Sequence, residues 1–350
     1  MFTLPVSSLK PGMILFDDIY NFDHEILLKS NVVLTDEKIK LLADYMIDEV
    51  DLAEPDEAEM TRYSHLHASA HFQRFEKIYT DSLTQFMRLI HNLDTGLELN
   101  LDKMLRLRDD IANAVMNGEQ LLDYLYNLMP NENEITYNHC FNCGLLCYYF
   151  AKWCDIPQAD LDMITLAGFL FDIGKTKVHD ELLWKPGKLT PEEFIQMQHH
   201  IHLGYEMLKN RELPPHVITV MIMHHERCDG SGYPARLKKS KIDPYALLAA
   251  IADTYEAMTH PRAQRTALTP FQAIRVFEEQ GFAKYGEKNT KIILTKIANM
   301  YEDRKVVLSN GFSGRISEIH EEALSRPTIF GNNMYFDLRE SPNEEIVRMA

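Results

Sequence analysis

Histidine is concentrated in one part of this sequence. Seven of the fifteen histidines fall between residues 179 and 225, many more than even scattering would place there. They are His179, His199, His200, His202, His216, His224 and His225. Neutral imidazole is the commonest protein ligand for transition metals. The cluster therefore favours a metal site, although exposed histidines on helix faces would leave the same pattern.

Two aspartates lie in apolar surroundings. Asp253 falls within the run 245–258, which is apolar on nearly every helical face, and Asp172 ends the apolar run 163–171. A carboxylate in such a helix is costly unless a cation or several hydrogen-bond donors meet it. Together with the histidines, the two acids predict a polar pocket inside a helical bundle. The alternative is that each carboxylate only accepts backbone hydrogen bonds near a helix end.

Helices must supply the frame for these residues. Between residues 118 and 299 the pattern is almost entirely helical, with N-cap signals at Thr190, Asp243 and Thr269. Further upstream, apolar residues recur at spacings of three and four over 72–90 and 101–115. We interpret these two faces as the core side of a helical pair, with a dimerising or signal-transmitting coiled coil as the alternative.

The two ends of the chain differ from its centre. Short strands are predicted at 13–16 and 25–28, followed by a helix that Thr35 caps. Strands at 306–309, 314–318 and 334–338 form a small β appendage. The predicted fold class is mainly α. Its predicted parts are a small α/β regulatory unit, a helical linker region, a helical domain and a β-rich appendage, over 1–55, 56–118, 119–305 and 306–350.

The composition argues against several classes of function. Lys and Arg total 36 against 52 Asp and Glu, so the formal net charge of −16 argues against non-specific binding to DNA, RNA or anionic membranes. We expect no signal peptide and no membrane span, and hence a cytoplasmic protein. Five cysteines argue against a disulfide framework. Four of them, Cys140, Cys143, Cys147 and Cys154, share one helical face and are predicted to be buried thiols rather than metal ligands.

Several motifs, in order, resemble the HD-GYP domains. They are DIGK at 172–175, KPGKLT at 185–190, HHER at 224–227 and DGSGYP at 229–234. The resemblance implies a helical, metal-dependent phosphohydrolase of the HD superfamily. It further implies a bacterial signalling enzyme that hydrolyses cyclic di-GMP to pGpG or GMP.

The resemblance also assigns roles to residues. The implied metal ligands are His139, Asp172, His200, His224, His225 and Asp253. Asp172 would bridge the metals, Lys175 would assist the attack, and Arg262 and Arg265 would bind substrate phosphates. One or two divalent ions are expected, Fe, Mn or Mg. Gly232-Tyr233-Pro234 would contact diguanylate cyclase domains, or would serve only as a rigid turn, and a homodimer is compatible with the sequence.

One position of the family motif differs in this sequence, and this difference leads to two alternative functions. The His of the His-Asp pair is Phe171 here, and a phenyl ring cannot bind a metal. Ile135 stands where some members carry a Glu for a third metal, so three metals are not expected. The first alternative function is therefore a catalytically impaired domain that acts as a cyclic di-GMP receptor or interaction module. The second is an HD-type phosphohydrolase of another nucleotide. A water molecule or His179 could also fill the vacant ligand position.

Overall fold

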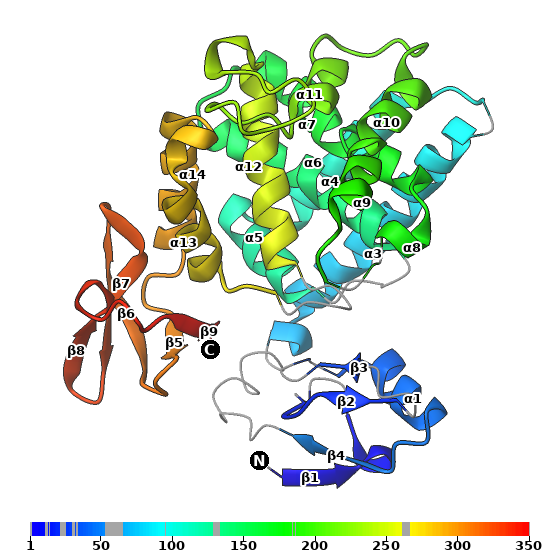
Figure 1. Cartoon of the computed structure of the whole chain (residues 1–350). Coiled ribbons are helices and arrows are strands. Elements are labelled where there is room, and N and C mark those ends of the chain that lie inside the picture. The colour runs from blue at the N-terminus through cyan, green and yellow to red at the C-terminus, as the bar shows by residue number, and fades with distance from the viewer. Residues whose placement is uncertain are drawn as a thin grey trace.

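The structure is a computed structural model, and most of its described residues are helical (Figure 1). It describes residues 2–10, 13, 15–21, 26–29, 32, 34–52, 66–94, 96–128, 134–183, 185, 187–260 and 267–349. The N-terminal strands and the C-terminal sheet lie at two different edges of the helical bundle (Figure 1). The predicted mainly helical fold class is confirmed. The division into four segments stays a prediction.

The N-terminal part has a small core of its own, centred on side chains such as Leu15, Leu34 and Leu42. It contains two antiparallel pairs, β1 (Phe2–Pro5) with β4 (Glu49–Leu52), and β2 (Ile19–Tyr20) with β3 (Ile26–Leu28). Helix α1 (Asp36–Asp44) begins after Thr35, whose side chain accepts a hydrogen bond from the backbone of Lys38, as predicted.

The strand predicted at 13–16 is wrong for the residues described there. Leu15 forms only an isolated bridge with Leu52. Its backbone N–H donates to the carbonyl of Val32 on one side, and the N–H of Phe16 donates to the carbonyl of Asp51 on the other. Single contacts therefore stand where the prediction expected a paired strand. The predicted strand at 25–28 corresponds to β3, and strands β1 and β4 were not predicted.

The centre is a bundle of helices, most of which contribute side chains to one hydrophobic core. The helices are α3 (Ala70–Asp94), α4 (Leu101–Ala114), α5 (Gly118–Asn127), α6 (Ile135–Trp153), α7 (Leu161–Leu170), α8 (Asp180–Leu183), α9 (Pro191–Gln198), α10 (His200–Leu208), α11 (Val217–Met223), α12 (Pro244–Thr259), α13 (Pro270–Gln280) and α14 (Glu287–Asn299). Helices α6, α7 and α12 are apolar on nearly all faces and are buried, as such helices must be.

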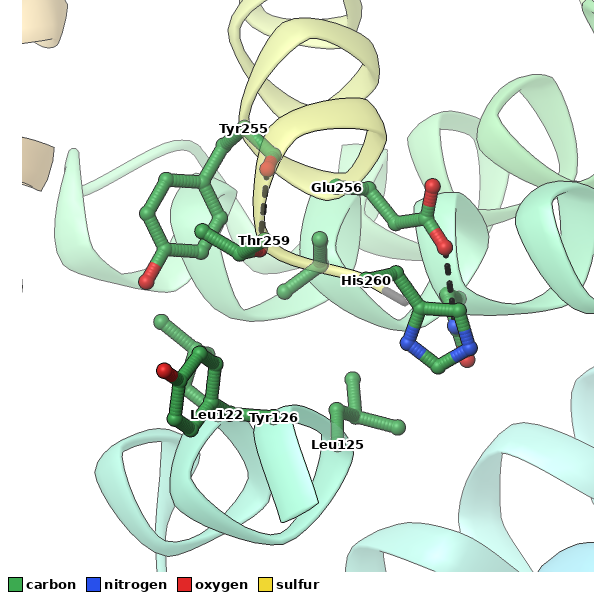
Figure 2. Close-up of a pocket in the computed structure, with 9 residues that line it drawn as sticks. Leu122, Leu125, Tyr126, Tyr255, Glu256, Thr259 and His260 are labelled. Carbon is green, nitrogen blue, oxygen red and sulfur yellow. Dashed lines mark hydrogen bonds between the residues drawn. The ribbon is translucent and has the colours of Figure 1, made fainter. Parts of the chain in front are cut away.

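The apolar faces predicted at 72–90 and 101–115 belong to α3 and α4. They are buried in the same core as α6 and α7, and α3 packs against α4. This packing favours the core-face interpretation over the coiled coil. Where α5, α6 and α12 meet, Leu122, Tyr126 and Tyr255 line a small pocket (Figure 2).

The C-terminal strands form one antiparallel sheet in the order β8-β7-β6-β5-β9. Their bounds are β5 (Lys305–Leu308), β6 (Ser313–His320), β7 (Ala323–Gly331), β8 (Met334–Asp337) and β9 (Ile346–Met349). Three of these strands were predicted, whereas β7 and β9 were not. Pro327 obscures β7, and it is tolerated because the pairing with β6 is irregular between Glu318 and His320.

Among the described residues, none of the helices combines the length and the apolar character that a bilayer-crossing segment requires.

The predicted N-caps at Thr190 and Thr269 both form capping boxes, and the second also contacts the C-terminal sheet. Thr190 caps the exposed helix α9, and Thr269 caps α13. The Thr269 hydroxyl additionally donates to the backbone oxygen of Ile346 in β9 at 2.9 Å. The sheet is therefore tied to the helical bundle at the start of α13.

We expect Thr269→Ala to lower the free energy of unfolding by about 1–2 kcal/mol, because a helix cap and a bond to β9 are lost together. Thr190→Ala is the matched control, since it removes a capping box alone. Urea unfolding of both variants measures the difference. Equal destabilisation by the two substitutions would contradict the role assigned to the bond with β9.

Candidate metal centre

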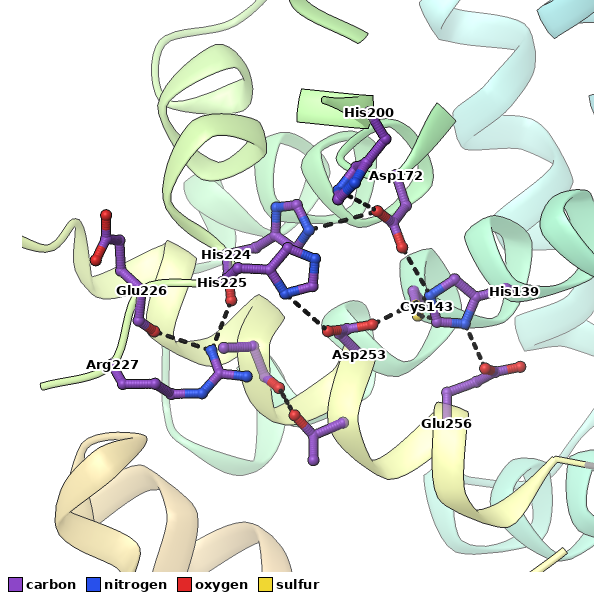
Figure 3. Close-up of polar contacts among 12 residues, drawn as sticks. His139, Cys143, Asp172, His200, His224, His225, Glu226, Arg227, Asp253 and Glu256 are labelled. Carbon is purple, nitrogen blue, oxygen red and sulfur yellow. Dashed lines mark hydrogen bonds and ion pairs between the residues drawn. The ribbon is translucent and has the colours of Figure 1, made fainter. Parts of the chain in front are cut away.

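The Asp172 carboxylate lies at the centre of the polar cluster and is fully buried (Figure 3). It follows helix α7 and precedes a short 3-10 turn at 173–177. Its Oδ1 lies 3.2 Å from Nε2 of His200 and 3.4 Å from Nε2 of His224. Its Oδ2 lies 3.0 Å from Nε2 of His139 and accepts a hydrogen bond from Nζ of Lys175. The two oxygens of one carboxylate therefore serve two different sets of side chains.

Backbone carbonyls set the orientation of two of the histidine rings. His200 donates through Nδ1 to the carbonyl of Met197 at 2.7 Å, and His224 donates through Nδ1 to the carbonyl of Met221 at 2.8 Å. Because a carbonyl can only accept, each Nδ1 carries hydrogen, and each Nε2 is left to point at Asp172 with a lone pair. This arrangement is typical of histidines that bind metals.

Burial and neighbouring charges favour the protonation states that a metal needs. Burial lowers the pKa of His200, and burial together with His224 lowers the pKa of His225 well below its usual value. Burial would raise the pKa of Asp172, but Lys175 and three histidines hold it well below its usual range. At neutral pH these groups are therefore neutral imidazoles beside an ionised carboxylate.

The first candidate set of ligands is Asp172, His200, His224 and His225, which we call the four-ligand group. One ligand atom from each lies within 4.8 Å of the others. Four of its atoms, Oδ1 of Asp172 and Nε2 of each histidine, are buried without a hydrogen-bond partner in the described part of the chain. Buried polar atoms are costly unless something satisfies them. Converging, unsatisfied N and O atoms fit a divalent transition metal ion.

The second candidate set is His139, Asp172 and Asp253, which we call the three-ligand group. Nε2 of His139 lies 3.2 Å from Oδ1 of Asp253. Burial would lower the pKa of His139, but Cys143, Glu256 and the two aspartates raise it well above its usual value. The acids around His139 thus favour a positive charge at this point, whether on the imidazole or on a metal ion.

Phe171 borders both groups, and the three-ligand group has three members among the described residues. Its ring is fully buried and lies 4.5 Å from the His224 ring and 6.2 Å from the His139 ring, between centroids. His179, considered as a substitute ligand, is exposed and belongs to none of the metal-binding groups found among the described residues. Asp172 is therefore the residue that joins two groups of unequal size.

These geometries can be compared with known proteins. Residues 123–288 match the family model described as HD domain. Residues 123–288, called the HD domain below, are therefore similar to that family. HD domains bind divalent metals, and the two groups above offer the ligand types that such ions need.

Three curated relatives carry related names. A cyclic di-GMP phosphodiesterase of Pseudomonas aeruginosa is 32% identical over 64% of this chain and 54% of its own length. A cyclic di-GMP phosphodiesterase of Thermotoga maritima is 31% identical over 62% of each protein. A 3'3'-cGAMP-specific phosphodiesterase 2 of Vibrio cholerae is 33% identical over 52% of this chain and 34% of its own length. The chain spans little more than half the length of the first of these relatives.

A solved structure supports the fold. An HDG"Y"P protein from Bdellovibrio bacteriovorus aligns with 85% of this chain and 99% of its own, with a TM-score of 0.54 at 17% identity. This likeness concerns the fold alone. Together with the family model and the curated relatives, it confirms the predicted resemblance to HD-GYP proteins.

A close contact of two backbones positions His200 in the HD domain. The 3-10 turn after Asp172 lies directly against the start of α10. A Cβ added to Gly174 would stand 1.9 Å from the carbonyl oxygen of His200 and 2.5 Å from the backbone nitrogen of Gly204. Only a residue without a side chain fits there. Gly174 thereby allows His200 to reach Asp172.

The Gly-Tyr-Pro loop of the HD domain is folded back onto a candidate ligand. The Tyr233 ring stacks on the His225 ring with centroids 4.5 Å apart. Buried Glu226 accepts hydrogen bonds from the backbones of Ala235 and Leu237, both at 2.7 Å. A Cβ on Gly232 would stand 2.4 Å from the carbonyl oxygen of His225. The loop is thus a tightly held support for His225, as the rigid-turn interpretation expects.

The structure brings together seven of the predicted site residues and leaves two outside its description. The seven are His139, Asp172, Lys175, His200, His224, His225 and Asp253. Arg262 and Arg265 lie outside the described residues. Whether the predicted ligands bind metal stays a prediction.

Sequence reasoning missed two residues of the site. Glu256 contacts His139 through Nδ1, and Cys143 lies 3.8 Å from both ring nitrogens of His139 (Figure 3). The signal for Glu256 was its place three residues after Asp253, on the same face of an apolar helix. Cys143 follows His139 by four residues on α6, so it lies on the same helical face as His139. It is buried, as predicted, and burial raises the pKa of its thiol to about 12.

We expect His200→Ala to reduce the metal content of the purified protein sharply, because it removes one of four converging ligands. His202→Ala is the control, since this histidine is exposed on the same helix. Elemental analysis of both variants, purified without chelator, measures metal per chain. Equal metal content in the two variants would contradict the four-ligand group.

Proposed function

We propose that this chain hydrolyses a phosphodiester bond of a cyclic dinucleotide, with cyclic di-GMP as the substrate, and that divalent metal ions support the reaction. The observation that carries the proposal is the buried Asp172 carboxylate, whose two oxygens face two candidate metal groups. A carboxylate shared in this way is the arrangement that two-metal hydrolysis of phosphodiesters uses. The names of the relatives from Pseudomonas aeruginosa and Thermotoga maritima support the choice of substrate.

Hydrolysis must overcome the negative charge of the phosphodiester. Divalent ions, when bound, polarise the phosphate and lower the pKa of water toward neutrality. Asp172 and the four-ligand group hold their places through buried contacts, so little rearrangement accompanies the reaction. The Gly-Tyr-Pro loop and Phe171 cover the histidines with aromatic rings and limit access of bulk water to them.

Lys175 is the cation best placed to act on the substrate. Its Nζ pairs with Oδ2 of Asp172, and its side chain is 21% exposed, so it reaches from the buried carboxylate toward the surface. Hydrolysis forms a phosphorus–oxygen bond from water and breaks the bond to a ribose oxygen, which must take up a proton. The Lys175 ammonium offsets phosphate charge and supplies that proton, and the proton that the attacking water loses returns to the Lys175 amine through solvent. Arg262 and Arg265 are proposed to bind the other phosphate, as the family resemblance implies.

A specific observation favours a second candidate function. The position that carries a metal-ligating His in the family is a buried phenyl ring packed on His224. Because a lost ligand weakens metal binding, the domain could bind cyclic di-GMP without turnover and act as a receptor. Contact with diguanylate cyclase domains through Gly232-Tyr233-Pro234 belongs to the same candidate. The name of the Vibrio cholerae relative adds 3'3'-cGAMP as an alternative substrate.

We expect the manganese-loaded full chain to convert cyclic di-GMP to pGpG or GMP, detected by chromatography, with 3'3'-cGAMP tested in parallel. Asp172→Ala should lower turnover at least about 100-fold, because both metal groups lose their common member. His202→Ala is the control and should keep its activity. If Asp172→Ala turned over substrate at the native rate, the site assignment would be wrong.

The Phe171→His variant separates the enzyme from the receptor. For an enzyme, we expect measurable native turnover and a modest increase when the imidazole is added to the three-ligand group. For a receptor, the native chain binds cyclic di-GMP in isothermal titration without hydrolysing it, and only the variant releases product. Turnover of the native chain at the rate of the variant would rule out the receptor.

A further inference from the structure

A chain of buried polar side chains leads from His139 to helix α3. His139 donates through Nδ1 to Oε2 of Glu256. Asn142 donates through Nδ2 to Oε1 of Glu256 at 3.0 Å. The Tyr79 hydroxyl donates to Oδ1 of Asn142 at 2.7 Å and contacts Oδ1 of Asn138 at 3.2 Å. All five side chains are buried, so water does not compete for these bonds.

The direction of these bonds determines which nitrogen of His139 faces the metal groups. A carboxylate can only accept, so Glu256 takes hydrogen from Nδ1. Nε2 is thereby the nitrogen that faces Asp172 and Asp253, at 3.0 and 3.2 Å. A carboxylate behind a metal-binding histidine fixes its ring and makes it a stronger ligand. Glu256 stands in that relation to His139.

Hydrogen bonds orient the Glu256 carboxylate at the edge of a small pocket. Glu256 borders the small pocket between α5, α6 and α12, together with Asn142 and His260 (Figure 2). Next to open space, a flexible Glu side chain has other rotamers within reach. The hydrogen bonds from His139 and Asn142 therefore select the observed one, and Tyr79 in turn selects the orientation of the Asn142 amide.

We propose that Glu256 is a positioning residue for His139, and that Asn142 with Tyr79 holds it in place. This series of hydrogen-bonded side chains joins the three-ligand group to α3, the first long helix after the N-terminal part. This support matters more because, among the residues that the structure describes, the three-ligand group has no fourth ligand to compensate for a misplaced imidazole. The inference rests on the metal centre of the proposed function and not on the identity of the substrate.

The test measures metal binding rather than activity. Metal-free full-length protein is titrated with Mn²⁺, and free Mn²⁺ is followed by electron paramagnetic resonance. Native protein should show two classes of site, with the four-ligand group binding more tightly. Glu256→Gln keeps the size of the side chain and removes its charge. It should weaken the second class about 10- to 100-fold and change the first class much less.

A second variant tests the end of the hydrogen-bonded series that is farthest from His139. It also keeps the proposal testable if Glu256→Gln does not fold. Tyr79→Phe removes only a hydroxyl and should weaken the second class by about 2- to 10-fold, the effect of one neutral hydrogen bond. Tyr285→Phe is the matched control. Tyr285 is equally buried and donates to an amide oxygen, that of Gln280, at 2.7 Å. The Tyr285→Phe variant should leave the Mn²⁺ affinity of both classes of site unchanged.

Three results would overturn the proposal. The first is unchanged affinity of the second class in Glu256→Gln. The next is the same effect from Tyr79→Phe and Tyr285→Phe, which would indicate general destabilisation. The last is a native protein with a single class of Mn²⁺ site. None of these readouts involves a nucleotide, so a failed hydrolysis assay would leave the test of Glu256 intact.

Discussion

The structure depends on keeping one ionised carboxylate, that of Asp172, inside an apolar bundle. An uncompensated charge in such surroundings costs several kcal/mol, so partners must come from elsewhere in the chain. His139 comes from α6, His200 from the start of α10, and His224 from the end of α11. Lys175 comes from the 3-10 turn that follows Asp172 itself. Lys175 brings a cation and His139 a basic imidazole to this carboxylate, whereas His200 and His224 bring imidazole nitrogens that would bind a metal ion beside it. The chain as a whole carries a net charge of −16, yet its centre is a local concentration of basic groups.

The close packing of backbones follows from the same requirement. His200 can approach Asp172 only if α10 lies directly on the turn after it, and Gly174 permits this contact. Gly232 performs the same task for the loop that supports His225. Both glycines occur in the motifs that resemble the HD-GYP family. Their presence is explained by steric contact at the site, independently of any chemistry.

Sequence reasoning could locate the charged centre because polar residues in apolar helices are conspicuous. Asp172 and Asp253 were found in this way, and the family resemblance selected His200, His224 and His225 from the cluster of seven histidines. Residues whose roles depend on partners far along the chain were missed. Glu256 and Tyr79 acquire their meaning only when α3, α6 and α12 meet. Strand β1 escaped prediction for a similar reason, since it pairs with β4 from the far end of the N-terminal part.

Phe171 offers an explanation for how the two candidate metal groups can differ in strength although they share Asp172. The ring fills apolar space against His224 and leaves the four-ligand group geometrically complete. By the family resemblance, the ligand that Phe171 replaces would belong to the three-ligand group, which consists of two carboxylates and one imidazole. Because both groups share Asp172, charge placed in one reduces the negative potential available to the other. An ion in the stronger group therefore makes the weaker one harder to fill, and the acids around His139, Glu256 included, offset that effect.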